Sequence, residues 1–236
     1  IEKFKAQEYW SIEADLNKKD TANKFRARLI KIGEQTLGKL DIKNQPETEK
    51  IVSDLDGAEY KIADINRKEA IRNPSPPFIT STLQQEASRK FGMSAKQTMM
   101  IAQQLYETGY ITYMRTDSVN LAESALQQTQ KVIIENFGKE YSLGEPRRYT
   151  TKSKGAQEAH EAIRPTVLTQ KPEMLKNGVD ARQFKLYDII WKRTVASQMQ
   201  QAVFDQTSVD ISAGNYTFRA NGQVIKFDGF IRAYTE

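Results

Sequence analysis

The run Asn73-Pro74-Ser75-Pro76-Pro77 marks the main change of character along this chain. Three prolines within four positions exclude a helix there, because proline lacks a backbone N–H and keeps the preceding residue extended. The apolar pattern is mostly of period two before this run and closer to 3.6 after it. The run therefore predicts a linker between a strand-rich segment and a helical one.

The segment before the linker is predicted to be mostly strand. Residues 25–29 alternate cleanly with a period of two, residues 9–14 show a weaker apolar-polar pattern, and residues 62–71 form a third extended run. A short stretch at 48–55 is compatible with a helix.

Helices are predicted after the linker. Ser81-Thr82-Leu83-Gln84 and Ser94-Ala95-Lys96-Gln97 both have the capping-box pattern, and Gly92 and Gly109 would end the two helices. Together, residues 81–108 resemble a helix-turn-helix. The elements predicted to follow are a short strand at 110–113, a helix at 120–137, and a capped helix at 180–201.

Strands return at about residue 203, and Asn221-Gly222 is a strong hairpin signal. We therefore predict an α+β fold. Residues 1–72 and 203–236 would form one discontinuous antiparallel β domain. Residues 73–202 would form an inserted, mainly α-helical domain that resembles a helix-turn-helix or winged-helix module.

The composition is that of an ordinary soluble protein, with 39% hydrophobic and 28% charged residues among 236. No apolar run approaches the roughly 18 residues of a membrane span, nothing resembles a secretory signal, and we expect a cytoplasmic protein. The absence of cysteine excludes disulfides and thiolate metal sites, and a single histidine excludes a histidine-rich metal site. A net charge of +5 permits nucleic-acid contact without establishing it. Because the chain starts without methionine and ends in a strand-like segment, we expect a piece of a longer protein.

The run Tyr110-Ile111-Thr112-Tyr113-Met114-Arg115-Thr116-Asp117-Ser118 carries the clearest chemical signal. On a strand, Tyr113 and Arg115 would share a face. A phenol can act as a nucleophile, and an adjacent guanidinium can bind a phosphodiester and favour the phenolate. The run therefore indicates chemistry on a nucleic-acid backbone. A core tyrosine followed by a turn and helix cap at 116–118 is the structural alternative.

A second candidate site surrounds His160. If this segment is helical, His160 and Arg164 share a face and can bind a phosphate. A capping or surface histidine explains the same residues equally well. Basic residues nearby can contact a nucleic-acid backbone, although a solvated loop is the favoured interpretation. These residues are Arg147, Arg148, Lys152 and Lys154, with Tyr141 and Tyr149 beside them.

Residues 76–118, PPFITSTLQQEASRKFGMSAKQTMMIAQQLYETGYITYMRTDS, closely resemble the active-site region of bacterial type IA DNA topoisomerases. The run AQEAHEAIRPT at 156–166 resembles a second motif of that family, and AQEYWSI at 6–12 also matches. The resemblance extends over essentially the whole chain, and the combination of the first two motifs is highly specific.

In that family the motif tyrosine attacks a single-strand phosphodiester and becomes linked to the 5′ phosphate. A second strand passes through the break, which is then religated, and negative supercoils are relaxed without ATP. The resemblance implies that Tyr113 is the nucleophile and that Arg115 orients it and stabilises the scissile phosphate. His160 and Arg164 would contact phosphate. The remaining motif positions, with DNA-binding roles, are Thr116, Asp117 and Ser118.

Family enzymes also carry a Toprim domain whose acidic residues bind Mg²⁺, and a further helical domain that holds single-stranded DNA. We expect neither in this chain, so the resemblance implies the strand-rich arch and the tyrosine domain only. It implies a monomer that acts on single-stranded DNA at the bacterial nucleoid. It implies no membrane partner, no small-molecule cofactor and no activity of the piece alone.

Two alternatives stay open. A tyrosine recombinase or type IB topoisomerase also uses tyrosine, but forms a 3′ link and places a His-x-x-Arg motif before it. Here the spacing is His-x-x-x-Arg, and the motif follows Tyr113. The other alternative is a non-catalytic helix-turn-helix module that reads duplex DNA. Its candidate reading residues are Gln97, Gln103 and Gln104.

Overall fold

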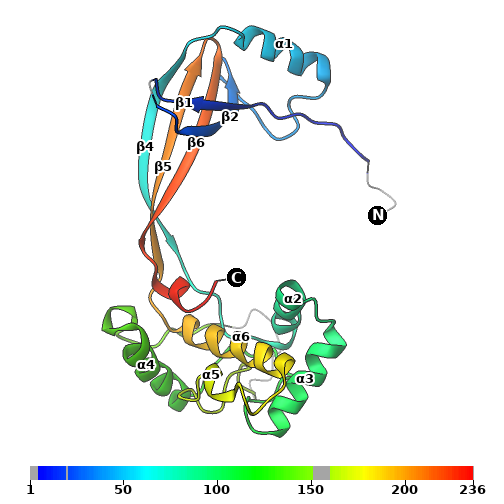
Figure 1. Ribbon diagram of the computed structural model, residues 1–236, viewed down its shortest axis with the longest axis vertical. Coiled ribbons are helices and arrows are strands. Elements are labelled where there is room, and N and C mark those ends of the chain that lie inside the picture. Colours follow the sequence, from blue (N-terminus) through cyan, green and yellow to red (C-terminus); the bar gives the residue numbers. More distant parts are fainter. Residues whose placement is uncertain (1–4, 20, 151–159, 236) are drawn as a thin grey trace. The chain divides into compact units, whose positions relative to one another are not determined.

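The computed structural model describes residues 5–19, 21–150 and 160–235. The chain forms two compact units, each with its own hydrophobic core. The first contains Ile1–Ala70 and Phe204–Ile225, and the second contains Ile71–Val203 and Lys226–Glu236. An antiparallel sheet together with several helices confirms the predicted α+β fold class (Figure 1).

A six-stranded sheet organises the first unit, with the order β1-β2-β6-β5-β4 and with β3 paired to β2. Its strands are β1 (Glu13–Asn17), β2 (Lys24–Ile32), β3 (Gln35–Thr36), β4 (Tyr60–Arg72), β5 (Ala202–Ala213) and β6 (Tyr216–Phe227). The period-two pattern predicted for β2 holds, because Ala27 and Leu29 are buried while Arg26 and Arg28 are exposed. The sheet thus joins segments that precede and follow the helical part of the sequence.

Helix α1 (Gln45–Leu55) packs on this sheet through Ile51 and Leu55. It begins at Asn44, whose side-chain oxygen accepts the N–H of Glu47 at 3.0 Å. Helix α1 therefore begins about one turn earlier than the helix predicted at 48–55.

The hairpin between β5 and β6 turns at Gly214-Asn215, where Gly214 has a φ of +57°. The prediction of a hairpin at Asn221-Gly222 is wrong, because these residues lie inside β6. Strand β6 pairs with β2 over residues 216–219, before Asn221, and its other neighbour in the sheet is β5, whose pairing keeps the backbone extended against its local turn preference.

The second unit is mainly helical and packs around α6 (Figure 1). Its helices are α2 (Thr80–Phe91), α3 (Ala95–Glu107), α4 (Glu123–Phe137), α5 (Pro172–Leu175) and α6 (Ala181–Ser197), with short 3-10 turns η1 (Lys139–Tyr141) and η2 (Gly229–Arg232). Helix α6 is the most buried because Leu186, Tyr187 and Ile190 face three neighbouring helices. No helix in the described part of the chain is long and apolar enough to cross a membrane.

Capping signals located two of these helices correctly. The capping boxes at Ser94 and Asp180 are present at the starts of α3 and α6. The box predicted at Ser81 is wrong, because α2 begins at Thr80 and the N–H of Ile79 donates to Thr82 Oγ1. Thr80 is drawn into hydrogen bonds with a distant segment, and this tertiary contact sets the start of α2.

Residues 226–236 belong to the helical unit, whereas the predicted β domain included them. Gly229 has a φ of +50°, and a Cβ there would lie 2.6 Å from the carbonyl oxygen of Gln200. Tyr234 is buried and donates its hydroxyl to the buried carboxylate of Glu86. Burial raises the pKa of Glu86, but its hydrogen bonds with Tyr234 and Arg89 outweigh burial and hold the pKa below its usual range.

Candidate functional site

Tyr113 lies in an irregular segment between α3 and α4, and not on a strand. The predicted strand at 110–113 is wrong, because Ile111 forms only an isolated bridge, to Pro165. Ile111 and Met114 are each 1% exposed and anchor the segment in the core. The i and i+2 argument for Tyr113 and Arg115 therefore does not apply, and the hydrogen bonds of neighbouring threonines fix the backbone instead.

Thr80, the first residue of α2, holds the backbone on the C-terminal side of Tyr113. Its hydroxyl donates to the carbonyl oxygen of Met114 at 2.7 Å and accepts the N–H of Thr116 at 2.9 Å. Its own N–H donates to the carbonyl oxygen of Thr116 at 3.0 Å. We refer to these three bonds as the Thr80 clasp. The clasp ties the tyrosine segment to the N-terminus of a helix 36 residues earlier in the chain.

Thr112 holds the backbone on the N-terminal side of Tyr113 in a similar way. Its hydroxyl donates to the carbonyl oxygen of Ala162 at 2.7 Å and accepts the N–H of Arg164 at 3.0 Å. The N–H of Thr112 donates to the carbonyl oxygen of Arg164 at 2.9 Å. The two sequence motifs, 50 residues apart, are therefore joined backbone to backbone.

The ring of Tyr113 is half-buried and contacts two other rings. The Tyr106 ring of α3 meets it edge-on at 5.3 Å between centroids, and the His160 ring lies 5.5 Å away. The structure thus brings His160 to Tyr113. It does so without a helical turn, because residues 160–165 are not helical, and the helical interpretation of this segment is wrong.

Residues 115–118 separate into two exposed and two buried side chains. Arg115 and Asp117 are exposed, and the described ranges contain no hydrogen-bond or ion-pair partner for the guanidinium of Arg115. Thr116 and Ser118 are buried. The hydroxyl of Thr116 accepts the N–H of Ser118 at 3.0 Å, so these two positions shape the turn toward α4.

Arg164 is largely enclosed, with a side chain 13% exposed. Its Nε donates to Glu161 at 2.6 Å and its Nη1 donates to the carbonyl oxygen of Pro165 at 2.8 Å. The guanidinium is therefore bound within its own segment, while its backbone is bound to Thr112. His160 and Arg115, in contrast, are both exposed.

Part of the predicted basic loop has a structural role. Arg147 donates to the carbonyl oxygens of Ser197 and Met199, and the Tyr149 hydroxyl donates to Ser197. The interpretation of this stretch as a solvated loop is therefore wrong for Arg147 and Tyr149, because their side chains hydrogen-bond to backbone carbonyls at the C-terminal end of α6. Arg148 is exposed and pairs with a glutamate of α4. Lys152 and Lys154 lie outside the described residues.

Sequence reasoning did not single out Thr80, Thr112, Tyr106 or Glu161. Thr112 stands inside the quoted motif, yet nothing local shows that its hydroxyl bridges to Ala162. Within residues 5–19, 21–150 and 160–235, no three acidic, histidine or cysteine side chains are grouped to hold a metal ion.

A family model described as DNA topoisomerase matches the sequence of this chain. The match covers residues 1–236, and the chain belongs to that family.

Among curated relatives, the chain is 43% identical to DNA topoisomerase 1 of Rickettsia felis over 246 residues, covering 100% of this chain and 32% of that protein. It is 45% identical to DNA topoisomerase 1 of Zymomonas mobilis over 238 residues, covering 100% of this chain and 19% of the relative. Full-length topoisomerase I from Thermotoga maritima is similar in structure, with a TM-score of 0.74 and 34% identity. That similarity covers 90% of this chain and 34% of the Thermotoga chain. The chain thus spans about a third or less of these proteins.

Proposed function

We propose that this chain is the tyrosine-bearing part of a type IA DNA topoisomerase. Tyr113 Oη attacks the phosphorus of one DNA strand, forming a phosphotyrosine bond to the 5′ phosphate and releasing a 3′ hydroxyl that takes up the proton. The reverse step restores the phosphodiester and the phenol after strand passage. The phosphoester is exchanged and not hydrolysed, so the cycle consumes no ATP. The observation that carries this proposal is the joining of the two motifs around Tyr113 by Thr112.

The proposed roles follow from exposure and hydrogen bonding. Arg115 is exposed and pairs with the scissile phosphate through charge-assisted hydrogen bonds. His160 lies against the Tyr113 ring and donates to the same phosphate. Arg164 is bound to Glu161, so it reaches phosphate only when an anion displaces that carboxylate. Asp117 is exposed and contacts the bound strand in this proposal, and the buried Thr116 and Ser118 hold the backbone on either side of it.

The remainder of the proposed activity lies in the longer protein. We propose that acidic residues of a Toprim domain hold Mg²⁺, that this piece alone does not cleave DNA, and that the protein acts as a monomer on single-stranded DNA at the bacterial nucleoid. The share of the relatives that this chain covers, 32% and 19% in the two cases above, supports a division of labour of this kind.

The helix-turn-helix alternative has less support. Helices α2 and α3 form, but the glutamines proposed to read bases are engaged within the chain. Gln97 caps α3, Gln103 donates to Glu107 at 2.6 Å, and Gln104 accepts from Gln183 at 3.2 Å.

The test uses the longer protein with Mg²⁺ and a single-stranded oligonucleotide labelled at its 3′ or its 5′ end. The reaction is stopped with denaturant, and protein-linked label is measured for the parent, Tyr113→Phe and Tyr106→Phe. Tyr106→Phe is the matched control, because it removes the hydroxyl of the ring that touches Tyr113. We expect the 3′-end label to stay with the parent and with Tyr106→Phe, and to be lost with Tyr113→Phe.

Two results would replace this proposal. Retention of the 5′-end label means a 3′ link and a recombinase-like enzyme. No adduct with either label makes Tyr113 structural and leaves a DNA-binding module.

A further inference from the structure

Tyr106, in the last turn of α3, is an aromatic residue to which the proposed chemistry gives no role. It is 40% exposed, and among the described residues its hydroxyl has no hydrogen-bond partner. Its ring meets the ring of Tyr113 edge-on, with 5.3 Å between the centroids and 67° between the planes. The ring, and not the hydroxyl, is therefore the part of Tyr106 that acts on Tyr113.

A turn of the Schellman type brings these two rings together. Gly109 has a φ of +79°, and its N–H donates to the carbonyl oxygen of Tyr106 at 2.9 Å. The N–H of Tyr110 donates to the carbonyl oxygen of Leu105 at 2.8 Å. These bonds end α3 and reverse the chain, so that the rings of residues 106 and 113 meet.

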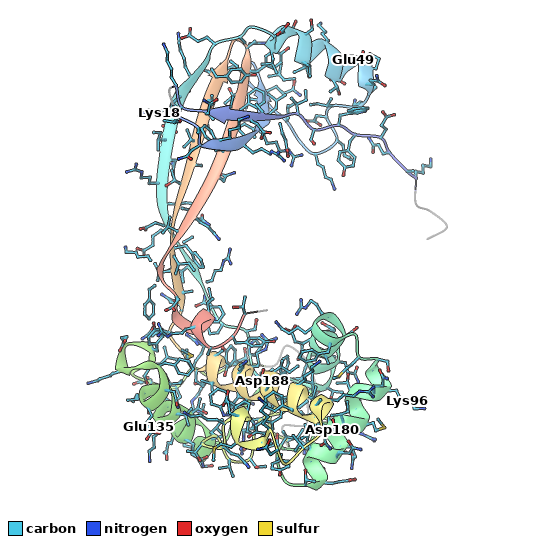
Figure 2. All side chains as sticks on the ribbon, viewed as in Figure 1. Lys18, Glu49, Lys96, Glu135, Asp180 and Asp188 are labelled. Carbon is cyan, nitrogen blue, oxygen red and sulfur yellow. The ribbon has the colours of Figure 1, made fainter. Side chains whose placement is uncertain are left out.

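The turn and the helix before it are both held in place. The hydroxyl of Thr166, in the second motif, donates to the carbonyl oxygen of Gly109 at 2.6 Å. Leu105 is fully buried, and α3 packs against α6. In Figure 2, Lys96 marks the first turn of α3 and Asp180 marks the cap of α6. The position of the Tyr106 backbone is thus set from two sides.

A second ring lies against Tyr113 and comes from the other motif. The centroid of the His160 ring is 5.5 Å from that of Tyr113, with 46° between the planes. No ring contact joins Tyr106 to His160 among the described residues, so the two rings meet Tyr113 at separate places. A half-buried tyrosine with free space around it can change between staggered χ1 positions. Two ring contacts restrict this motion and keep the Tyr113 hydroxyl in one direction.

We propose that Tyr106 is a positioning residue for Tyr113, a role that rests on the nucleophilic function proposed above. Its ring keeps the phenol oxygen directed at the scissile phosphodiester without touching the reacting atoms. A nucleophile already held in the attack geometry loses less entropy on the way to the transition state. The effect should therefore appear in the rate of strand cleavage and not in the affinity for DNA. In the phosphotyrosine intermediate the DNA also holds the ring, so religation should depend less on Tyr106.

The first test uses the longer protein with Mg²⁺ and a saturating single-stranded oligonucleotide in a single turnover. Cleavage is followed as protein-linked label, and religation as transfer of preformed adduct to an added strand with a 3′ hydroxyl. The dissociation constant for the oligonucleotide is measured by fluorescence anisotropy in a Tyr113→Phe background, which cannot form the adduct.

We expect Tyr106→Ala to slow cleavage at least about tenfold, to slow religation less, and to change the dissociation constant by less than about twofold. Tyr106→Phe keeps the ring and should cleave within about twofold of the parent rate. Met100→Ala is the matched control, because it also truncates a large exposed side chain of α3, one that is 53% exposed. It should cleave like the parent.

The second test needs no DNA and no activity. The 236-residue chain carries 3-fluorotyrosine at position 113, and the ¹⁹F linewidth of this residue reports how freely its ring moves. The resonance should be broad in the parent and in Tyr106→Phe. It should be narrower in Tyr106→Ala, because the released side chain moves on the picosecond to nanosecond timescale.

Several results would overturn the positioning role. Cleavage by Tyr106→Ala at the parent rate, or an unchanged ¹⁹F linewidth, would show that the ring does not restrain Tyr113. Slower cleavage that comes with equally weaker binding would make Tyr106 a DNA contact. An equal loss in Tyr106→Phe would make the hydroxyl the acting group, and an equal loss in Met100→Ala would make the effect a general one on α3. A parent protein that forms no adduct overturns the function proposed for Tyr113 itself, and this role with it.

Discussion

Replacing Thr80 with valine should loosen the backbone around Tyr113 by a predictable amount. Valine has nearly the volume of threonine but cannot donate to the carbonyl of Met114 or accept the N–H of Thr116. Met114 is 1% exposed and Thr116 is 8% exposed, so little water is available to replace these bonds. At about 1 kcal/mol per hydrogen bond, the free energy of unfolding of the helical unit should fall by about 2 kcal/mol.

Chemical denaturation of the 236-residue chain measures the total effect, and amide hydrogen exchange locates it. A local loss of about 2 kcal/mol should make the Thr116 amide exchange roughly 30-fold faster. The matched control is Thr129→Val, which removes a buried hydroxyl bond to Ala125 inside α4, away from the clasp. Thr80→Ser retains the hydroxyl and should behave like the parent. If Thr80→Val loses no more stability than Thr129→Val and leaves Thr116 exchange unchanged, the clasp does not hold this segment.

Three further perturbations test the packing of each unit. Gly229→Ala should cost about 3 to 5 kcal/mol in thermal denaturation, because left-handed backbone and a close carbonyl both oppose a Cβ. Gly92→Ala, which also has a positive φ but open space around it, should cost only about 1–2 kcal/mol. The folded-state pKa of Glu86 is lowered, so its stabilisation is present above its ordinary pKa of 4.5 and is lost as pH falls through the folded value. Glu86→Gln should therefore flatten the acid side of a stability-pH curve. The hydrogen bond to an aspartate of α1, together with burial, raises the pKa of Tyr216 from 10.0 to about 12. Its stabilisation is complete below pH 10 and disappears as pH rises toward about 12, and Tyr216→Phe should remove this decline in denaturation at alkaline pH.

Several elements of this fold follow from local sequence alone. The capping boxes at Ser94 and Asp180 located α3 and α6, because a cap needs only residues within one turn of each other. Alternation at residues 25–29 located β2 for the same reason. The segments that identified the family, 76–118 and 156–166, are likewise runs of adjacent residues, and the family match over the whole chain agrees with them.

The predictions that failed are those in which a distant contact overrides a local preference. Asn221-Gly222 is a turn signal by itself, yet its place inside β6, next to β5 in the sheet, keeps it extended. Residues 110–113 have strand character, but among the described residues no second strand lies beside them beyond the bridge at Pro165. The start of α2 at Thr80 depends on Met114 and Thr116, which no capping rule includes.

The sequence by itself determined the strand-rich and helical parts of the chain, the two motifs, and the membership of the chain in a DNA topoisomerase family. Only the tertiary structure decided which side chains hold Tyr113 and what surrounds it. Thr80 and Thr112 act through hydrogen bonds to residues 36 and 50 positions away. Local propensity extends over about four residues, whereas these bonds form only after packing has brought separate segments together.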